Sequence, residues 1–324
     1  MIPKVIVSPK FDSQKIIFNL PKCDVEVSFD PEISQEYFSL IKALDGTRTI
    51  TELSSQFVSL SKKNLHEFID ELYSHNIVDD CSLPEGRLGI DVLFEIEDLT
   101  NELLYKTLYK NPFWLACQNA KTKGDIPLNV IYGQVIENYH FLFRESYFDA
   151  PVLSYVGNLN VRLALNAFFA EEYGHDELLL QSLNSVGITR SQLSMTMPLP
   201  ETMGLCNALA YWSHNDPLFF FTTLGVLEGK DIKQDSFIEA AIRMGFPSKF
   251  IDPVQTHSNI NLKGEHGNLT REIFSAIPII DIETIKRLRS QTYLFVELYD
   301  ALYTGIWNYY SNPDNKLLRL VNEI

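Results

Sequence analysis

The sequence predicts a small α+β domain followed by a larger all-helical domain, and a change of pattern along the chain supports this prediction. From about residue 4 to residue 30, apolar and polar residues alternate and β-branched residues are frequent, which is typical of short strands. From residue 84 onward the alternation is absent, and long segments with the start and stop signals of helices take its place. The expected domains therefore cover residues 1–83 and 84–324.

In the first domain, three strands and then three helices are expected. The strands correspond to KVIVSP, KIIFNL and CDVEVSF, and the turn-forming residues DSQ and PK separate them. The helices correspond to DPEISQEYFSLIKALDG, RTITELSSQFVSL and KKNLHEFIDELYSHNIV. The first helix begins with Asp30 and Pro31 and stops at Gly46, which are residue types favoured at helix starts and ends.

In the second domain, every segment with a clear pattern is helical. DIPLNVIYGQVIENYHFLFRESYF opens with Asp125 and Pro127, and NLNVRLALNAFFAEEYGHDELLLQSLNSVG is longer and closes at Gly187. Further helices are expected over residues 203–213, 217–229, 235–244, about 248–275 and 281–311. The prediction is an all-α bundle with a large core.

Composition and charge limit the classes of function. Of the 324 residues, 45% are apolar and 21% are charged, as in soluble globular proteins. The net charge of −15 argues against nucleic acid as the main partner, because phosphate binding needs clustered basic residues. We find neither a secretory signal nor an apolar run of the roughly 18 residues that a membrane helix needs. Four cysteines without a CxxC motif indicate free thiols, and the expected location is the cytoplasm.

Three strands and then three helices, with LDGTRTITEL between the first two helices, resemble the peptide-binding winged-helix domain first known from the chaperone of pyrroloquinoline-quinone biosynthesis. The resemblance covers residues 1 to about 82. It implies that the leader of a precursor peptide pairs with the edge strand CDVEVSF and packs against the helix over residues 64–75. The alternative is a generic winged helix that serves a homodimer or a regulatory role.

The segment FFAEEYGHDELLL contains the first candidate metal ligands. On a helix, Glu172 and His175 share one stripe with the apolar residues around them, and Glu171 is within reach of His175 at i+4. A lone carboxylate on such a stripe is expensive to bury in ionised form, and a cation removes that difficulty. A Glu with a His three residues later is a common helical ligand pair. The alternative is a Glu-rich surface with a capping histidine.

Two other segments offer partners for this pair. Glu137 lies among apolar residues in QVIENYHF, and the adjacent long helices are expected to pack antiparallel, so that Glu137 and Glu172 meet at similar height. His140 makes this a second ExxH motif, with a supporting or packing role. The later segment QTHSNINLKGEHGNLT contains His257, Asn261, Glu265 and His266.

These segments resemble the haem-oxygenase-like di-iron oxidases and oxygenases, which are relatives of thiaminase II and pyrroloquinoline-quinone synthase. The likeness spans about residues 110–310. The family's ligands are a lone Glu, a Glu/His helix and a late helix with the motif His-x-x-x-Asp-x-x-His. The resemblance therefore implies Glu137, then Glu172 (or Glu171) with His175, and a third group that starts at His257.

The third group departs from the family motif. Asn261 stands where the motif has Asp, and Gly264 stands where it has the second His. His266 follows His257 by nine residues, which is about 900° on a regular helix and places the two on opposite faces. Both can bind a metal only if a bulge or break intervenes, and otherwise the stripe is His257, Asn261 and Glu265.

A mixed histidine and carboxylate site suits iron or manganese better than structural zinc. The resemblance implies that the metal is Fe(II), with two ions expected and O₂ as the co-substrate. The predicted ligands are Glu137, Glu172, His175, His257 and His266. Glu171, Asn261, Glu265 and Glu228 are alternatives, and an exposed position at a helix end is the plainer interpretation of Glu228.

Together the two domains predict an O₂-dependent oxidase or oxygenase that modifies a residue of a precursor peptide held by the first domain. Tethering in this way raises the local concentration of the substrate. A cofactorless oxidase like pyrroloquinoline-quinone synthase and a non-catalytic peptide-binding scaffold are the alternatives. A ferritin-like bundle is disfavoured, because its two ExxH helices are separated by a helix that carries only Glu, whereas the two here are consecutive.

Overall fold

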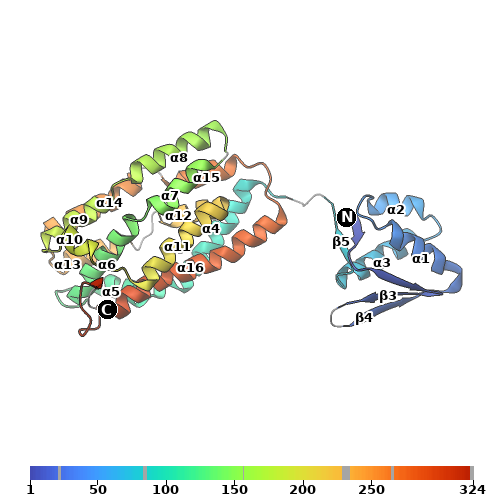
Figure 1. Ribbon diagram of the computed structural model, residues 1–324, viewed down its shortest axis with the longest axis horizontal. Helices are drawn as coiled ribbons and strands as arrows, with labels where there is room; N and C mark the ends of the chain where they lie inside the picture. Colours follow the sequence, from blue (N-terminus) through green and yellow to red (C-terminus); the bar gives the residue numbers. More distant parts are fainter. Residues whose placement is uncertain (21–22, 83–85, 156, 228–233, 264–265, 322–324) are drawn as a thin grey trace. The chain divides into compact units, whose positions relative to one another are not determined.

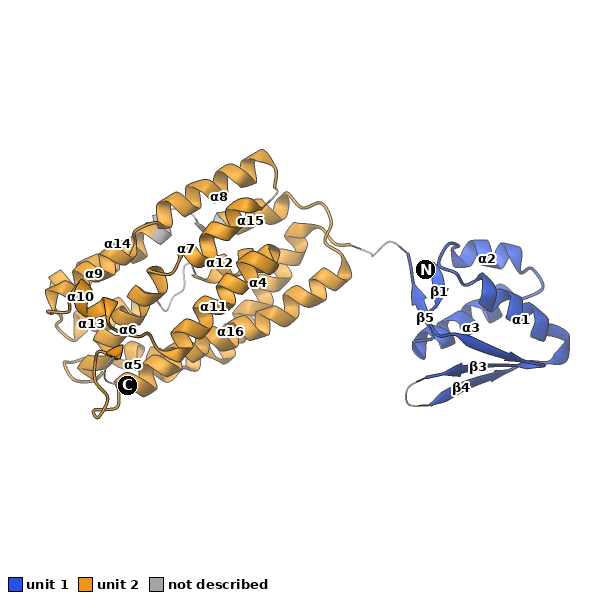
Figure 2. Cartoon of the chain, viewed as in Figure 1, with its two compact units in different colours: residues 1–85 blue, residues 86–324 orange. Residues whose placement is uncertain are grey.

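The computed structural model describes residues 1–20, 23–82, 86–155, 157–227, 234–263 and 266–321. For residues 234–235, 261–263 and 266–268 it describes the backbone alone. The chain forms two compact units, Met1–Glu85 and Gly86–Ile324 (Figure 2). The first unit contains strands and helices, and the second is built from helices (Figure 1). The predicted fold class is therefore confirmed.

The first unit contains two small antiparallel sheets. One has the strand order β2 (Pro9–Asp12), β3 (Lys15–Asn19) and β4 (Asp24–Ser28), so that β4 lies at an edge. The other pairs β1 (Pro3–Val5) with β5 (Val78–Asp80). The prediction of three strands was therefore incomplete. The first expected strand is two strands, because β1 pairs with a segment more than seventy residues later while β2 begins the meander.

Three helices cover these sheets and supply most of the core of the first unit. They are α1 (Pro31–Ala43), α2 (Ile50–Gln56) and α3 (Lys62–Ser74), close to the predicted segments. Thr49 and Glu52 form a capping box at the start of α2, which satisfies backbone groups that the helix leaves open. The core includes the fully buried side chains Ile16, Phe18, Leu40, Leu53, Leu65 and Ile69.

The second unit is a helical bundle. Its helices, in chain order, are α4 (Gly89–Lys106), α5 (Pro112–Asn119), α6 (Leu128–Leu142), α7 (Ser146–Asp149), α8 (Leu159–Glu172), α9 (Asp176–Ser185), α10 (Arg190–Ser194), α11 (Pro200–Asn215), α12 (Pro217–Leu227), α13 (Gln234–Arg243), α14 (Ser248–Lys263), α15 (His266–Ser275) and α16 (Ile282–Tyr310). Two short 3-10 helices cover Leu108–Lys110 and Ala150–Ser154. Helices α4 and α5 lie in a part of the sequence for which no helix was predicted. Within the described residues, no helix combines the length and apolar character needed to cross a membrane.

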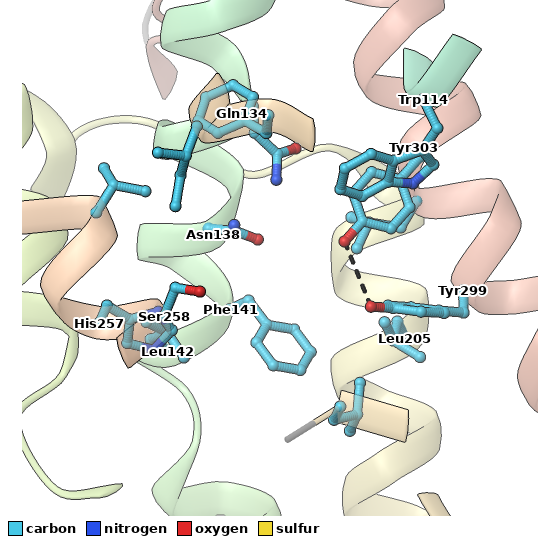
Figure 3. Close-up of a pocket in the computed structure, with 15 residues that line it drawn as sticks. Trp114, Gln134, Asn138, Phe141, Leu142, Leu205, His257, Ser258, Tyr299 and Tyr303 are labelled. Atoms are coloured by element: carbon cyan, nitrogen blue, oxygen red, sulfur yellow. Dashed lines mark hydrogen bonds between the residues drawn. The ribbon is translucent and has the colours of Figure 1, made fainter. Parts of the chain in front are cut away.

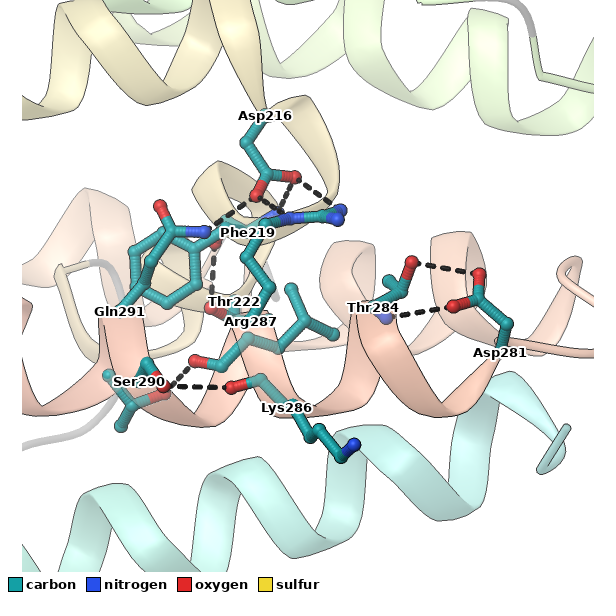
Figure 4. Close-up of polar contacts among 11 residues, drawn as sticks. Asp216, Phe219, Thr222, Asp281, Thr284, Lys286, Arg287, Ser290 and Gln291 are labelled. Carbon is teal, nitrogen blue, oxygen red and sulfur yellow. Dashed lines mark hydrogen bonds and ion pairs between the residues drawn. The ribbon is translucent and has the colours of Figure 1, made fainter. Parts of the chain in front are cut away.

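The long helix α16 packs against α4, α5, α6 and α11, and α9 packs against α6 and α14. A polar contact fixes the junction of α11 and α12 against α16 (Figure 4). Asp216 accepts hydrogen bonds from Arg287 Nε at 2.7 Å and from Gln291 Nε2 at 2.6 Å. This ties α12, whose three successive phenylalanines are fully buried, to the longest helix of the bundle.

Two predicted helices are interrupted in the structure. The helix expected to run to Gly187 is divided into α8 and α9, because Gly174 adopts a positive φ of +98° that ends a right-handed helix. The helix expected over about 248–275 is divided into α14 and α15. The first division changes where the candidate ligands lie.

Candidate metal centre

The break between α8 and α9 brings Glu172 and His175 together. Glu172 is the last residue of α8, and His175 is the residue before α9. His175 Nδ1 lies 2.8 Å from Glu172 Oε2, and both side chains are buried, with 7% and 1% of their surfaces exposed. The pair expected on one continuous helix is thus formed across a turn.

His257 on α14 joins this pair. Its ring centroid lies 5.2 Å from that of His175, and the ring planes are nearly perpendicular. Its Nε2 is buried and has no hydrogen-bond partner among the described residues. Burial and the neighbouring His175 lower the pKa of His257 to about 4, so the imidazole is neutral at pH 7 and keeps a lone pair for a cation.

The donor chemistry of these three residues fits iron. Two imidazoles and one carboxylate are the ligand set of many non-haem Fe(II) oxygenases, and this set leaves positions open for other ligands. The unsatisfied Nε2 of His257 is the kind of buried atom that a bound ion would satisfy. Among the described residues, however, no group of three or more His, Cys, Asp or Glu side chains is placed to hold a metal ion as it stands.

Glu137 has a different environment from the one predicted. It is fully buried on α6, where Oε2 accepts hydrogen bonds from Leu199 N at 3.0 Å and from Thr202 Oγ1 at 2.5 Å. Oε1 accepts a hydrogen bond from Tyr310 OH at 2.8 Å. Burial raises the pKa of Glu137, although the three hydrogen bonds act in the opposite direction. Through these hydrogen bonds the Glu137 carboxylate connects α6 to α11 and α16.

Two other residues of interest, Glu171 and His140, lie on these helices. Glu171 lies on the exposed side of α8, next to the buried Glu172. His140 is buried on α6, and its Nε2 has no partner among the described residues. Burial and the nearby Arg144 lower its pKa to about 4, so that it too is neutral at pH 7.

The remaining candidates are described in part or not at all. Asn261 is in α14 and His266 is the first residue of α15, but their side chains are not described. Because His257 and His266 lie on different helices, the angle expected on one regular helix does not apply to them. Glu265 and Glu228 lie outside the described residues.

A cavity of about 110 Å³ lies beside His257 (Figure 3). The face of α6 that lines it carries Gln134, Asn138 and Phe141, spaced by four and three residues as one helical face requires. Trp114 of α5 and two tyrosines of α16 line it as well, with Tyr303 OH donating to Tyr299 OH at 3.4 Å. Gln134 and Asn138 are not among the predicted site residues, although two amides four residues apart on an apolar helix indicate a polar position on its buried face.

Comparisons with known proteins agree with this centre. A family model described as "Iron-containing redox enzyme" matches residues 139–300, which is 162 of the chain's 324 residues. The matched range includes Glu172, His175 and His257 and begins after Glu137. No curated protein matches the chain.

Several solved structures are similar to the chain. A TenA homologue from P. horikoshii OT3 has 15% identity and a TM-score of 0.50, with 67% of this chain and 98% of that chain covered. A TenA homologue from Pseudomonas syringae pv. tomato str. DC3000 has 11% identity and a TM-score of 0.52, with 65% and 91% covered. A domain of unknown function with a haem-oxygenase-like fold from Shewanella denitrificans OS217 has 16% identity and a TM-score of 0.49, with 66% and 89% covered. At these identities the two TenA homologues show the fold alone.

Proposed function

The chain belongs to the family of iron-containing redox enzymes, and from this premise we propose that its helical unit is an O₂-dependent non-haem iron oxidoreductase whose iron is held by Glu172, His175 and His257. The proposal rests on one observation. The buried carboxylate of Glu172 lies beside the imidazole of His175, which directly precedes α9, and the imidazole of His257 on α14 lies beside that of His175. The two TenA homologues show the fold alone.

Each of the three residues has a distinct role in this proposal. Glu172 supplies a negative charge in a buried place, where an ion is the least costly partner for it. His175 and His257 supply nitrogen donors, and the low pKa of His257 keeps its imidazole unprotonated far below pH 7. Bound Fe(II) supplies the electrons that the reduction of O₂ requires.

We propose two ions in the loaded enzyme. Carboxylate di-iron bundles use about six side chains, and the described cluster supplies three of them. Further donors would come from Asn261, Glu265 and His266, which follow His257 along the chain, and from Glu228, which follows Leu227 directly. Leu227 lines the same cavity as His257, whereas Glu228 and Glu265 lie outside the described residues. Two irons per chain after anaerobic loading is the expected result, and a firm maximum of one would contradict it.

We propose that the first unit binds the leader of a precursor peptide. The edge strand β4 offers unpaired backbone groups to an added strand. At the end of β4, the ring of Phe29 stacks on that of Tyr37 with their centroids 4.5 Å apart, and the ring of Phe68 on α3 packs edge-on against Tyr37 with their centroids 4.8 Å apart. These three rings line a hollow between β4, α1 and α3. The acidic side chains that line it are Asp30, Glu67 and Glu71, and its lining contains no Lys or Arg. The features favour an extended peptide with an apolar anchor and basic residues.

Peptide binding can be tested with synthetic probes on the full chain. A labelled ten-residue peptide that alternates Phe and Lys is expected to bind at least about tenfold more tightly than its Phe and Glu counterpart, and added salt should weaken it. Glu71→Lys should weaken binding strongly. Asp70→Lys is the matched control, because Asp70 is exposed on the same helix and does not line the hollow. Equal binding of both peptides would contradict the proposal.

Catalysis can be tested with the precursor peptide encoded by a short reading frame beside the gene. The protein is loaded with Fe(II) without oxygen, the peptide and then O₂ are added, and the mass of the peptide is measured. A mass change that requires both iron and O₂ is expected, and Glu172→Ala should abolish it. A mass change without metal would support a cofactorless oxidase, and no change under any reductant would support a scaffold.

A further inference from the structure

The cavity beside His257 has an apolar wall. Its lining includes Phe141, Leu205 and Leu302, and among the described residues that line it there is no Asp, Glu, Lys or Arg (Figure 3). A charged group that entered it would lose its hydration without gaining an ion partner, at a cost of several kcal/mol. The cavity therefore favours a neutral occupant.

Three further polar atoms in its lining are unsatisfied. Trp114 Nε1, Gln134 Oε1 and Ser258 Oγ are buried and have no hydrogen-bond partner among the described residues. They come from three different helices, α5, α6 and α14. Each unsatisfied group costs about 1–3 kcal/mol, so three of them around one cavity point to a ligand that completes their hydrogen bonds.

The chemistry of these atoms defines what the ligand must carry. The indole N–H of Trp114 can only donate, so the ligand needs an acceptor. The side-chain oxygen of Gln134 can only accept, so the ligand needs a donor. The Ser258 hydroxyl can do both. One hydroxyl group on the ligand supplies the acceptor and the donor together.

Size and shape narrow the class further. A dry cavity of about 150 Å³ in another protein holds benzene, and the cavity here, at about 110 Å³, is smaller, so it excludes any occupant larger than one ring. Four aromatic side chains line it, namely Trp114, Phe141, Tyr299 and Tyr303. Aromatic walls favour an aromatic occupant through edge and stacking contacts.

We propose that this cavity binds a neutral phenol, such as the side chain of a tyrosine, with its hydroxyl between Trp114 and Gln134. His257 lines the same cavity, so the bound ring lies beside the proposed iron ligand. That this ring is the group oxidised rests on the proposed function, whereas its binding does not. The inference can therefore be tested on protein without iron.

The test follows the indole N–H signals of the ¹⁵N-labelled full chain by NMR. The chain has three tryptophans, and the signal lost in Trp114→Phe belongs to Trp114. p-Cresol should shift this signal in a saturable way and leave the signals of Trp212 and Trp307 in place. Toluene, which lacks the hydroxyl, should bind at least about tenfold more weakly, because it leaves the polar atoms unsatisfied. Benzoate should not bind.

Gln134→Leu is the variant that tests the acceptor. It should bring the affinities of p-cresol and toluene to within about threefold of each other, since the donor of the phenol then has no acceptor there. Gln181→Leu is the matched control, because Gln181 is exposed on α9. Equal binding of toluene and p-cresol to the parent protein would overturn the proposal, as would tighter binding of isobutyramide than of p-cresol, or no saturable shift with any probe. A cresol shift without any oxidation activity would sink the proposed function and leave this inference standing.

Discussion

Glu137 and Glu172 are both buried in the helical unit, yet the regions around them differ in kind. Around Glu137, a backbone N–H and two hydroxyls from α11 and α16 donate hydrogen bonds to the carboxylate. Beside Glu172, by contrast, His175 Nδ1 lies 2.8 Å from Oε2, and the imidazole of His257 lies beside that of His175. A carboxylate that accepts three hydrogen bonds from the protein holds helices together, whereas a carboxylate beside two imidazoles offers the donor types that bind a cation.

The largest effect is expected at the second region. Glu172→Gln, His175→Ala or His257→Ala should each lower iron affinity by more than about tenfold, since even indirect partners of metal ligands cost 10- to 100-fold. Iron content after anaerobic loading and dialysis measures this, with circular dichroism to show that the fold remains. Glu171→Gln is the matched control, because it changes an exposed carboxylate next in sequence. Retention of iron by Glu172→Gln together with its loss in Glu171→Gln would reverse our assignment.

At Glu137 we expect a loss of stability without a loss of iron. Glu137→Ala leaves three buried donors without an acceptor, which should lower the free energy of unfolding by about 2–4 kcal/mol and Tm by about 5–10 °C. The iron content of the remaining folded protein should stay near that of the parent. Glu137→Gln, which keeps the shape and one acceptor, should lose less stability. If Glu137→Gln instead keeps Tm and loses iron, the comparison fails and Glu137 is a ligand.

The turn between the two parts of the Glu172 region can be tested separately. Gly174→Ala places a side chain at a φ of +98°, which costs about 1–2 kcal/mol and favours a continuous helix through His175. Gly187→Ala is the matched control, because Gly187 has a φ of +87° and the same open surroundings at the other end of α9. Both should lower Tm by about 2–6 °C, and only Gly174→Ala should also weaken iron binding. Equal iron affinity in the two variants would show that the turn does not position His175.

A further effect concerns pH. Burial lowers the pKa of His140 to about 4 from an ordinary value of 6.5. Between pH 4 and pH 6.5, His140 is therefore protonated in the unfolded chain and neutral in the folded chain. Stability from this group is therefore complete above pH 6.5 and is lost as the pH falls, by about 2 kcal/mol at pH 5. His140→Phe should remove that part of the loss, as measured by urea unfolding at pH 7 and pH 5. An unchanged difference between the two pH values would mean that His140 is not buried as a neutral group.

Local patterns predicted much of the architecture. The change from alternating residues to helical segments predicted the correct order of an α+β unit and a helical bundle, and the starts of α1 and α16 lie within the expected segments. The pairing of β1 with β5 could not be predicted from local patterns, because both strands are short and lie at opposite ends of the first unit's sequence. The interrupted helices show a second limit, since Gly174 alone does not reveal whether a helix continues or stops.

Sequence by itself determined which residues carry unusual chemistry, because a Glu or His inside an apolar helical stripe is visible from a spacing of three and four residues. Only the tertiary structure decided which of them meet. The donors to Glu137 lie 62, 65 and 173 residues away along the chain, and His257 reaches His175 from another helix. Such partners depend on which helices pack together, as α6 does on α9 and α9 on α14. Periodicity fixes the face of a helix on which a residue lies, whereas packing between distant segments fixes what that face contacts.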